Sequence, residues 1–178
     1  MAQPEFSVPV RMTVNGQEWE GTLDVRTSVL DALVTDIGVT SVKKGCDHGQ
    51  CGACTVLADG RRIVACLALA ASYDGAEVTT AEGLGTVDSL SGLQAAFVDH
   101  DGLQCGYCTP GQICSAQGML SEARASSNGP STGEGDTGGL LTEADIRELM
   151  SGNLCRCGAY TNIAAAIGEV AGLKGQKS

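Results

Sequence analysis

The fold of this chain is decided by the stretch Gly45-Cys46-Asp47-His48-Gly49-Gln50-Cys51-Gly52-Ala53-Cys54. Three cysteines fall within nine residues of it, and Cys66 follows after a further eleven residues. Three thiols so close together force the backbone to wrap tightly around whatever they bind. Gly45, Gly49 and Gly52 suit such a loop, because glycine has no Cβ to clash and tolerates a positive φ. The stretch therefore predicts a metal-binding loop with cysteine ligands.

The spacing of these cysteines narrows the kind of centre. Plant-type ferredoxins hold a [2Fe–2S] cluster by Cys-x4-Cys-x2-Cys with a fourth cysteine further along the chain. A zinc knuckle is the alternative, but zinc ribbons use a Cys-x2-Cys pair at both ends, and this part of the chain has one such pair only. We therefore expect a [2Fe–2S] cluster with four ligands, which are Cys46, Cys51, Cys54 and Cys66.

A second set of cysteines lies in the other half of the chain and consists of Cys105, Cys108, Cys155 and Cys157. Taken alone, Cys105-Gly106-Tyr107-Cys108 could be a thioredoxin-like redox pair or half of a zinc site. Thioredoxin motifs follow a strand, whereas the neighbours here have a helical pattern, so ligation by four thiolates together with Cys155 and Cys157 is the better interpretation. The spacing favours a second cluster at this place and leaves zinc as the alternative. The ninth cysteine, Cys114, falls inside a predicted helix, where we expect a buried structural thiol.

The composition excludes several classes of protein. The formal net charge of the 178 residues is −10, which argues against nucleic acid as a partner. The sequence has no apolar run of about eighteen residues, so we expect no membrane span. It shows no export signal, and cytosolic proteins use cysteines for metals more often than for disulfides. We therefore expect a cytoplasmic protein.

The first half of the chain, residues 1–84, has the pattern of a small sheet with one helix. Alternating apolar residues and turn pairs predict strands, and Ser28 with Asp31 predicts a capping box for the helix. The expected elements are a hairpin around Asn15-Gly16, a helix over 29–37 ended by Gly38, a hairpin over 53–66 around Asp59-Gly60, and a short strand over 77–80. This order is that of a β-grasp ferredoxin.

The second half, residues 85–178, has a helical pattern. Four helices are expected. The first carries Leu90, Leu93 and Phe97 on one face, and the second begins with Pro110 after a Thr109 cap. The third begins after a capping box of Thr142 and Asp145, and the fourth runs over 162–170. Each cysteine pair directly precedes a helix, where partial positive charge favours an anionic cluster. The Ser- and Gly-rich stretch over about 125–139 is expected to be a mobile surface loop. The predicted fold class is α+β, with a β-grasp [2Fe–2S] domain over 1–84 and a four-helix bundle with a second cluster over 85–178.

Three motifs together resemble a known family. KGCDHGQCGACTV around Cys46, QCGYCTPG around Cys105 and SGNLCRCGAY around Cys155 are similar to the iron–sulfur subunit of molybdenum hydroxylases. This group includes xanthine dehydrogenases, aldehyde oxidoreductases and aerobic carbon monoxide dehydrogenases. The resemblance runs from about Val8 to Val170, and the motifs occur in the family's order. It implies that this chain carries electrons and that the substrate is oxidised on another subunit.

The resemblance also implies a direction of electron flow. A large subunit would hold a molybdenum–pterin cofactor, and a medium subunit would hold FAD. Carried over residue by residue, the set of Cys105, Cys108, Cys155 and Cys157 would hold the cluster nearer molybdenum, and the set of Cys46, Cys51, Cys54 and Cys66 the one nearer flavin. Gln104 and the region of Cys157 would contact the pterin.

The last motif continues as Cys157-Gly158-Ala159-Tyr160, where many members of the family have Cys-Thr-Gly-Tyr. This form resembles three-subunit bacterial aldehyde oxidoreductases that use molybdopterin cytosine dinucleotide. The substrate expected from the resemblance is therefore an aldehyde, which is oxidised to a carboxylic acid. A hydroxylase of an N-heterocycle or of carbon monoxide, a free-standing two-cluster ferredoxin and a zinc-stapled structural module remain alternatives.

Overall fold

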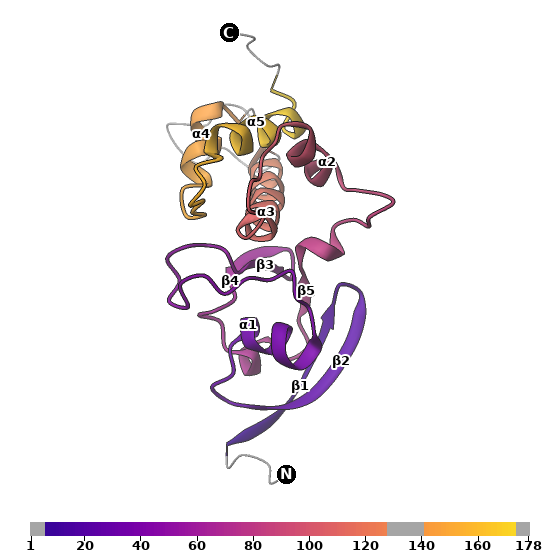
Figure 1. Cartoon of the computed structure of the whole chain (residues 1–178). Helices are drawn as coiled ribbons and strands as arrows, with labels where there is room; N and C mark the ends of the chain where they lie inside the picture. Colours follow the sequence, from indigo (N-terminus) through magenta and orange to yellow (C-terminus); the bar gives the residue numbers. More distant parts are fainter. Residues whose placement is uncertain (1–5, 128–140, 174–178) are drawn as a thin grey trace.

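The computed structural model describes residues 6–127 and 141–173. One half of the chain contains a five-stranded sheet, and helices make up the other half, with one long helix pointing at the sheet (Figure 1). The strands are β1 (Ser7–Val14), β2 (Gln17–Asp24), β3 (Thr55–Ala58), β4 (Arg61–Val64) and β5 (Glu77–Thr79). Their order in the sheet is β2-β1-β5-β3-β4. The pair β1–β5 is parallel, and the other three neighbouring pairs are antiparallel.

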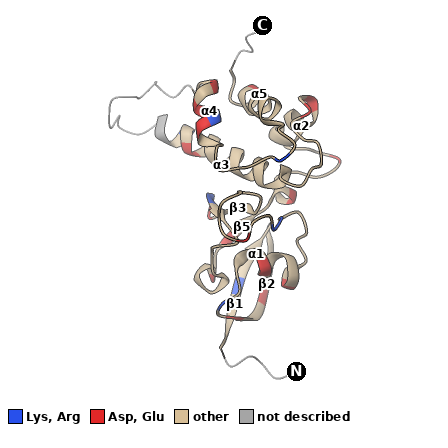
Figure 2. Cartoon of the chain, turned by 60° about the vertical axis from the view of Figure 1, so that its left-hand side comes forward, with Lys and Arg blue, Asp and Glu red and all other residues tan. Residues whose placement is uncertain are grey.

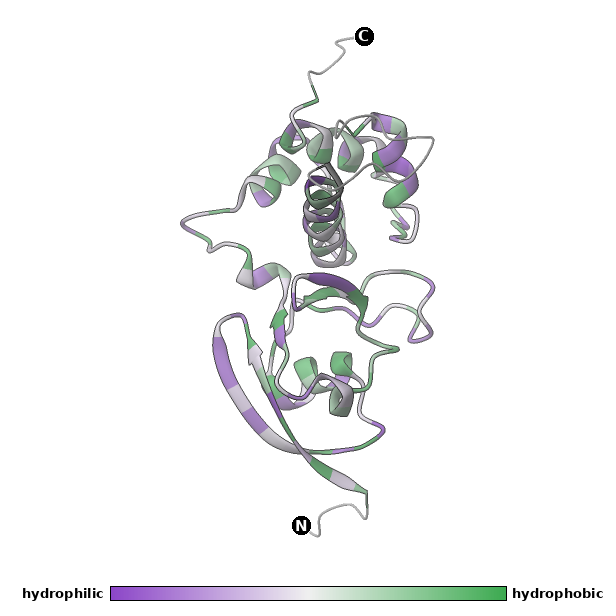
Figure 3. Ribbon diagram, turned by 180° about the vertical axis from the view of Figure 1, so that it is seen from behind, coloured by the Kyte–Doolittle hydropathy of each residue, from purple (hydrophilic) through white to green (hydrophobic). Residues whose placement is uncertain are grey.

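Both predicted hairpins are present. Val14 pairs with Gln17 across a two-residue turn, in which Asn15 and Gly16 have φ of 51° and 78°. Positive φ at both central residues is the geometry that matches the twist of a two-stranded hairpin. Asp59-Gly60 makes the same kind of turn between β3 and β4. The edge strand β2 is largely hydrophilic, as expected for a strand that faces water (Figure 3).

The helix predicted after the first hairpin is present but changes its winding. It begins as α1 (Val29–Asp31) and continues as the π-helical segment η1 (Ala32–Ile37). The Asp31 N–H donates to the Ser28 hydroxyl, so Ser28 caps the helix as predicted. The Asp31 carboxylate accepts from the same hydroxyl instead of from the Ser28 backbone, so the capping box is incomplete. Gly38 has φ of 85° and ends the segment.

The described residues of the second half form four helices. They are α2 (Gly92–Asp99), α3 (Thr109–Ser127), α4 (Glu143–Leu149) and α5 (Tyr160–Val170). Two short 3-10 segments, η2 (Ala70–Tyr73) and η3 (Ala81–Gly83), complete the elements of the described residues. α5 packs against α2 and α4, and α3 packs against α2 and against β3 and β4. Figure 2 shows acidic residues in α2, α4 and β2, which fits the negative net charge.

Each half has a hydrophobic core of its own. The core of the sheet half is built mostly from aliphatic side chains of β1, the α1–η1 helix and β3, including Val10, Leu30, Leu33 and Val56. The core of the helical half includes Phe97, Met119, Ile146 and Ile167. The described residues contain no helix that is long and apolar enough to cross a membrane.

The helix boundaries correct four predictions. Leu90 lies outside α2 and is exposed, because Ser91 caps that helix in a capping box with Gln94. Thr109 is the first residue of α3 and not its cap, since the Gln112 N–H already donates to the Cys108 carbonyl.

The last two corrections concern helices that are longer than predicted. α5 begins at Tyr160, two residues before the predicted start. α3 extends to Ser127, so the loop predicted over 125–139 begins later, and its remaining residues lie outside those described. The capping box of Thr142 and Asp145 at α4 is confirmed.

Candidate metal centres

The first set of cysteines lies around one loop of the sheet half. Cys46, Cys51 and Cys54 are on the segment between η1 and β3, and Cys66 follows β4. The Cys51 thiol lies close enough to Cys46 to help lower the pKa of Cys46, and the Cys66 thiol lies close enough to Cys54 to add to the effect of burial on the pKa of Cys54. The structure thus brings together all four predicted residues, arranged as two neighbouring pairs.

The surroundings of Cys46 and Cys54 shift the pKa values of their thiols in opposite directions. Backbone N–H groups of His48 and Gln50 donate to the Cys46 sulfur and lower the pKa of that thiol to about 6. The Gln50 nitrogen lies 3.3 Å from it. Burial raises the pKa of Cys54 to about 12, and only 2% of this residue is exposed. A bound cation deprotonates a coordinating thiol, so a metal at this place would convert Cys54 to a thiolate despite its burial.

The glycines of the loop are required where the sequence predicted them. Gly49 and Gly52 have φ of 79° and 67°. A Cβ on Gly45 would lie 2.7 Å from the Cys51 sulfur, which is closer than side chains pack. Asp47 also has a positive φ, of 59°, and its position gave no signal of this in the sequence. The backbone is therefore folded tightly enough to hold its thiols in a fixed arrangement.

The second set lies in two turns between helices. Cys105 and Cys108 are between α2 and α3, and Cys155 and Cys157 are between α4 and α5. The thiols again lie as neighbouring pairs, because Cys157 lies close enough to Cys105, and Cys155 close enough to Cys108, to affect the pKa of those thiols. Each pair joins one turn to the other. The predicted position just before the helices α3 and α5 is confirmed.

The electrostatics of the second set resemble those of the first. The N–H of Tyr107 donates to the Cys105 sulfur and lowers the pKa of that thiol. Burial raises the pKa of Cys108 to about 11. Burial also opposes ionisation of Cys155, but N–H groups led by that of Ala159 lower its pKa overall. Each set therefore combines thiolates favoured by backbone donors with thiols that need a cation to ionise.

The arrangement of the cysteines as pairs distinguishes a site for a single zinc ion from a site for a two-iron cluster. Over residues 6–127 and 141–173, no three His, Cys, Asp or Glu side chains converge as ligands of a single ion. A zinc site gathers its four ligands around one ion, whereas a two-iron cluster takes two thiolates on each iron. Two pairs of thiols in each set have the donor chemistry of a cluster. All nine cysteines are free thiols, so none is used in a disulfide.

The remaining candidate residues have the roles expected of them. Cys114 is 1% exposed in the helical half, where burial raises its pKa to about 12, and it joins neither set. The His48 ring hydrogen-bonds to the Cys46 carbonyl with its Nδ1 at 2.5 Å. His100 lies beyond α2 and pairs with Glu169. The two histidines therefore lie outside the thiol pairs.

Two family models match the chain in succession. One is described as a 2Fe-2S iron-sulfur cluster binding domain and matches residues 12–79, and the other is described as a [2Fe-2S] binding domain and matches residues 80–168. The aldehyde oxidoreductase iron-sulfur-binding subunit PaoA of Escherichia coli O157:H7 is 53% identical over 169 residues, which are 95% of this chain and 73% of PaoA. The nicotine 6-hydroxylase small subunit of Paenarthrobacter nicotinovorans is 39% identical over 98% of this chain and 96% of its own length.

Solved structures agree with these relatives. Quinoline 2-oxidoreductase from Pseudomonas putida 86 matches with a TM-score of 0.78 and 37% identity over 94% of both chains. Aldehyde oxidoreductase from Desulfovibrio gigas matches with a TM-score of 0.75 and 35% identity, over 94% of this chain and 18% of that longer one. This chain belongs to the iron–sulfur subunits of the molybdenum hydroxylase family. It therefore carries two [2Fe–2S]-binding domains and is an electron-transfer component of an oxidoreductase.

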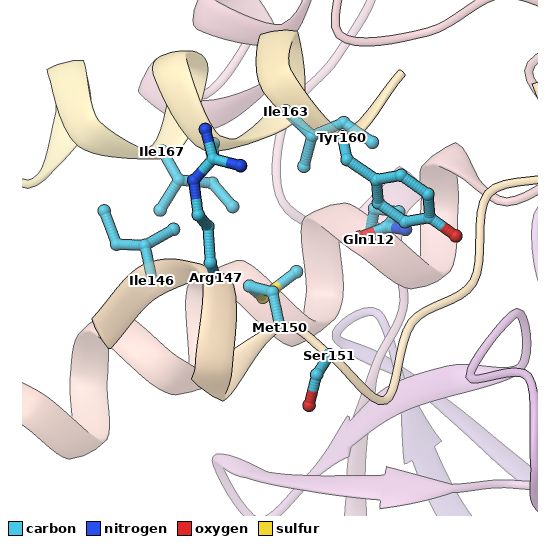
Figure 4. Close-up of a pocket in the computed structure, with 9 residues that line it drawn as sticks. Gln112, Ile146, Arg147, Met150, Ser151, Tyr160, Ile163 and Ile167 are labelled. Carbon is cyan, nitrogen blue, oxygen red and sulfur yellow. The ribbon is translucent and has the colours of Figure 1, made fainter. Parts of the chain in front are cut away.

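The residue that the resemblance links to the pterin lies on the surface of this iron–sulfur subunit. Gln104 is exposed, and so are Cys105 and Cys157. Figure 4 shows an apolar pocket of the helical half, lined mainly by side chains of α4, α5 and the residues directly after α4, with Gln112 of α3 near the ring of Tyr160. The Tyr160 hydroxyl accepts from the Cys155 N–H at 2.8 Å, so the wall of this pocket is tied to the second cysteine set.

Sequence reasoning about this subunit missed the contacts between the two cysteine sets. The Leu154 N–H donates to the Cys51 carbonyl, and the Tyr107 hydroxyl donates to the Lys44 carbonyl. Elsewhere between the halves, Arg62 of β4 binds the Glu122 carboxylate of α3 and donates to the Leu149 carbonyl at the end of α4. The partners lie 60 to 103 positions apart in the sequence, so no local pattern could have indicated them.

Proposed function

We propose that this chain relays electrons within a molybdenum hydroxylase, from a molybdenum–pterin site on a large partner subunit to FAD on a medium partner subunit. The observation that carries the proposal is the presence of two complete sets of four cysteines, each arranged as two thiol pairs. A chain with two such sets, and with no further metal-ligand cluster among the residues that the structure describes, suits electron transfer better than substrate conversion. The relatives named as small or iron–sulfur subunits support the presence of partners.

We infer the ligands from the thiol pairs. In the first set, Cys46 with Cys51 would bind one iron, and Cys54 with Cys66 would bind the other. In the second set, the corresponding pairs are Cys105 with Cys157 and Cys108 with Cys155. The proposed domains are a β-grasp ferredoxin-like domain over 1–84 and a four-helix bundle over 85–178. The positions of the two hydrophobic cores and the ranges of the two family models support this division.

The proposed order of the two clusters follows from the family resemblance, which links Gln104 and the region of Cys157 to the pterin. The exposed Gln104 and Cys157 suit contact with a pterin on the large subunit, so we propose that the second set receives electrons from molybdenum. The first set would pass them on to FAD. The proposed location is the cytoplasm, where free thiols are maintained.

The proposed substrate is an aldehyde, and the proposed molybdenum cofactor is molybdopterin cytosine dinucleotide. The identity of 53% to the PaoA subunit of an aldehyde oxidoreductase supports the substrate class, as does the Cys157-Gly158-Ala159-Tyr160 motif. Oxidation of an N-heterocycle is the second candidate, because the nicotine 6-hydroxylase small subunit is 39% identical over almost the whole chain.

The substitution Cys46→Ser tests the order of the relay in the assembled enzyme. We expect substrate to reduce molybdenum and the second cluster while FAD stays oxidised, as read by EPR and by flavin absorbance. Cys114→Ala is the matched control, because Cys114 belongs to neither set, and it should transfer electrons to FAD. Full turnover of the Cys46→Ser enzyme with a flavin-dependent acceptor would show that the proposed order is wrong.

A further inference from the structure

The two cysteine loops touch each other directly, although they belong to different halves of the chain. The Leu154 N–H, next to Cys155 of the second set, donates to the carbonyl of Cys51 of the first set at 2.9 Å. The Tyr107 hydroxyl, next to Cys108, donates to the Lys44 carbonyl at 2.7 Å. Side chains and backbone of the second set therefore lie against the backbone of the first.

Asn153 occupies the centre of this contact. Only 6% of the residue is exposed, and its side-chain amide donates to the Gly52 carbonyl at 2.9 Å. The same amide nitrogen lies 3.3 Å from the Thr55 hydroxyl and 3.3 Å from the Gly111 carbonyl. Gly52 lies within the first cysteine loop, Thr55 begins β3, and Gly111 lies in the first turn of α3. One side chain thus connects the first loop, the sheet and the helix that follows Cys108.

The backbone of Asn153 is held from the other side. Its carbonyl accepts from the buried Gln112 amide at 2.8 Å. The segments around it are packed too closely for side chains, because a Cβ on Gly52 would lie 2.6 Å from the Gly152 carbonyl oxygen, and a Cβ on Gly111 would lie 2.5 Å from the Gly52 carbonyl oxygen. A buried polar network whose groups are all satisfied holds its members in one arrangement. The described residues contain no buried side-chain polar atom without a partner.

We propose that Asn153 is a positioning residue, whose side-chain amide locks the two cysteine loops together and so fixes the separation of the two clusters. The inference rests on the proposed function, since it assumes that electrons cross from one set to the other. Electron tunnelling slows steeply with distance, so a loose joint between the halves would slow the relay even with both clusters intact. Asn153 contacts none of the eight cysteine sulfurs by a hydrogen bond that the structure records, and its effect would be on distance.

The substitution Asn153→Ala tests this role in the iron-loaded enzyme. It removes the three side-chain contacts but keeps the backbone carbonyl that Gln112 binds. The measurement is the low-temperature EPR spectrum of the fully reduced protein, in which the dipolar splitting between the two clusters falls with the cube of their distance. We expect a smaller and broader splitting with unchanged iron content. Asn162→Ala is the matched control, because Asn162 is an exposed asparagine of α5 that also donates to a backbone carbonyl, that of Asp101.

A second readout does not depend on the clusters. Hydrogen–deuterium exchange of the segment 150–158, read by mass spectrometry, should become about ten-fold faster in Asn153→Ala and stay unchanged in Asn162→Ala. Loss of one network of buried hydrogen bonds raises the equilibrium constant for local opening by about that factor. A splitting and an exchange rate equal to those of the unsubstituted protein would overturn the proposal.

A milder substitution decides the matter if Asn153→Ala does not fold. Thr55→Val keeps the shape of the side chain but removes the hydroxyl that receives from Asn153 and donates to Gly52. We expect the same changes in splitting and exchange, but smaller, and unsubstituted values would overturn the role of Asn153. An unsubstituted chain that holds no iron would instead refute the proposed function, and the exchange rates would still report whether Asn153 joins the loops.

Discussion

At the scale of single residues, the environment of each cysteine sulfur decides its chemistry. Cys46 and Cys105 open their sets, and each receives the N–H of the residue two positions on, which lowers the pKa of both thiols. Cys54 and Cys108 are more buried, and their pKa values are raised to about 12 and about 11. Hydrogen bonds to the sulfurs are also a main control of cluster potential. Side chains next to the cysteines can therefore be replaced without loss of a cluster, provided that the backbone donors stay.

Replacement of the exposed Gln104, at the proposed pterin contact, tests whether a side chain next to a cysteine can be changed without loss of the cluster. Gln104→Ala should leave the iron content unchanged, while the reoxidation of molybdenum in the assembled enzyme slows by about ten-fold, a usual cost for losing an outer partner of a metal site. Rapid-freeze EPR of the molybdenum signal measures this rate. Gln50→Ala is the matched control, because Gln50 is likewise exposed and directly precedes a cysteine of the first set. Equal rates and equal molybdenum content in the two variants would remove the pterin role.

The cysteine positions could be predicted from the sequence, and the contacts around them could not. The spacing separated eight cysteines into two sets and left Cys114 as a buried thiol, because cysteine ligands recur at short spacings such as Cys105 with Cys108 and Cys155 with Cys157, and the family resemblance then favoured a cluster for the second set. Asn153 and Tyr107 gave no such signal. Their partners are Gly52 and Lys44, which belong to the other half. The accepting group in each case is a backbone carbonyl, which every residue type has, so the sequence at these positions does not reveal the hydrogen bond.

At the scale of elements, a capping side chain indicated the start of a helix at some ends and not at others. The box of Thr142 and Asp145 was found from sequence, whereas that of Ser91 and Gln94 was missed because Leu90 continued the apolar pattern one turn too far. The π-helical winding of η1 was also missed, since periodicity over six residues does not distinguish the two helix types. Local chemistry thus predicts where a helix begins better than how it is wound.

The capping box of α4 should make stability depend on pH. The Thr142 hydroxyl and N–H donate to the Asp145 carboxylate and lower its pKa below the usual 3.8. A depressed pKa in the folded state contributes stability that is present above pH 3.8 and lost as the pH falls through the folded value. We expect the midpoint of thermal unfolding, measured by circular dichroism, to be higher for the natural chain than for Asp145→Asn at pH 7. The difference should close below pH 3.8, and a difference that grows in acid would contradict the assignment.

The contact between β4 and α3 provides a test at the same scale. Arg62 makes a two-point pair with Glu122 and also donates to the Leu149 carbonyl at 3.2 Å. Lysine cannot reproduce this fork, so Arg62→Lys should lower the free energy of unfolding by about 1 kcal/mol, with the exposure of Glu122 limiting the loss. Urea unfolding measures the change. Arg61→Lys is the control on the exposed neighbouring position, and an equal loss there would show that the Arg62 contacts contribute nothing.

At the scale of the whole molecule, the two halves are joined so that both cysteine sets meet at their boundary. α3 packs on β3 and β4, and the loops of the two sets are connected by Asn153, Leu154 and Tyr107. A carrier that diffuses between partners needs one exposed cluster. A chain with two sets held at a fixed separation is instead suited to pass electrons through itself, between two partner subunits.

The role of this chain as the electron relay of a molybdenum hydroxylase is tested most directly by its metal content, measured after the chain is tagged and purified gently from its own host. We predict about four iron atoms per chain, two for each [2Fe–2S] centre, together with near-stoichiometric molybdenum and two larger co-purifying subunits. Zinc in place of iron, or four iron atoms with neither molybdenum nor partner subunits, would contradict the assignment of this chain as the electron relay of a molybdenum hydroxylase.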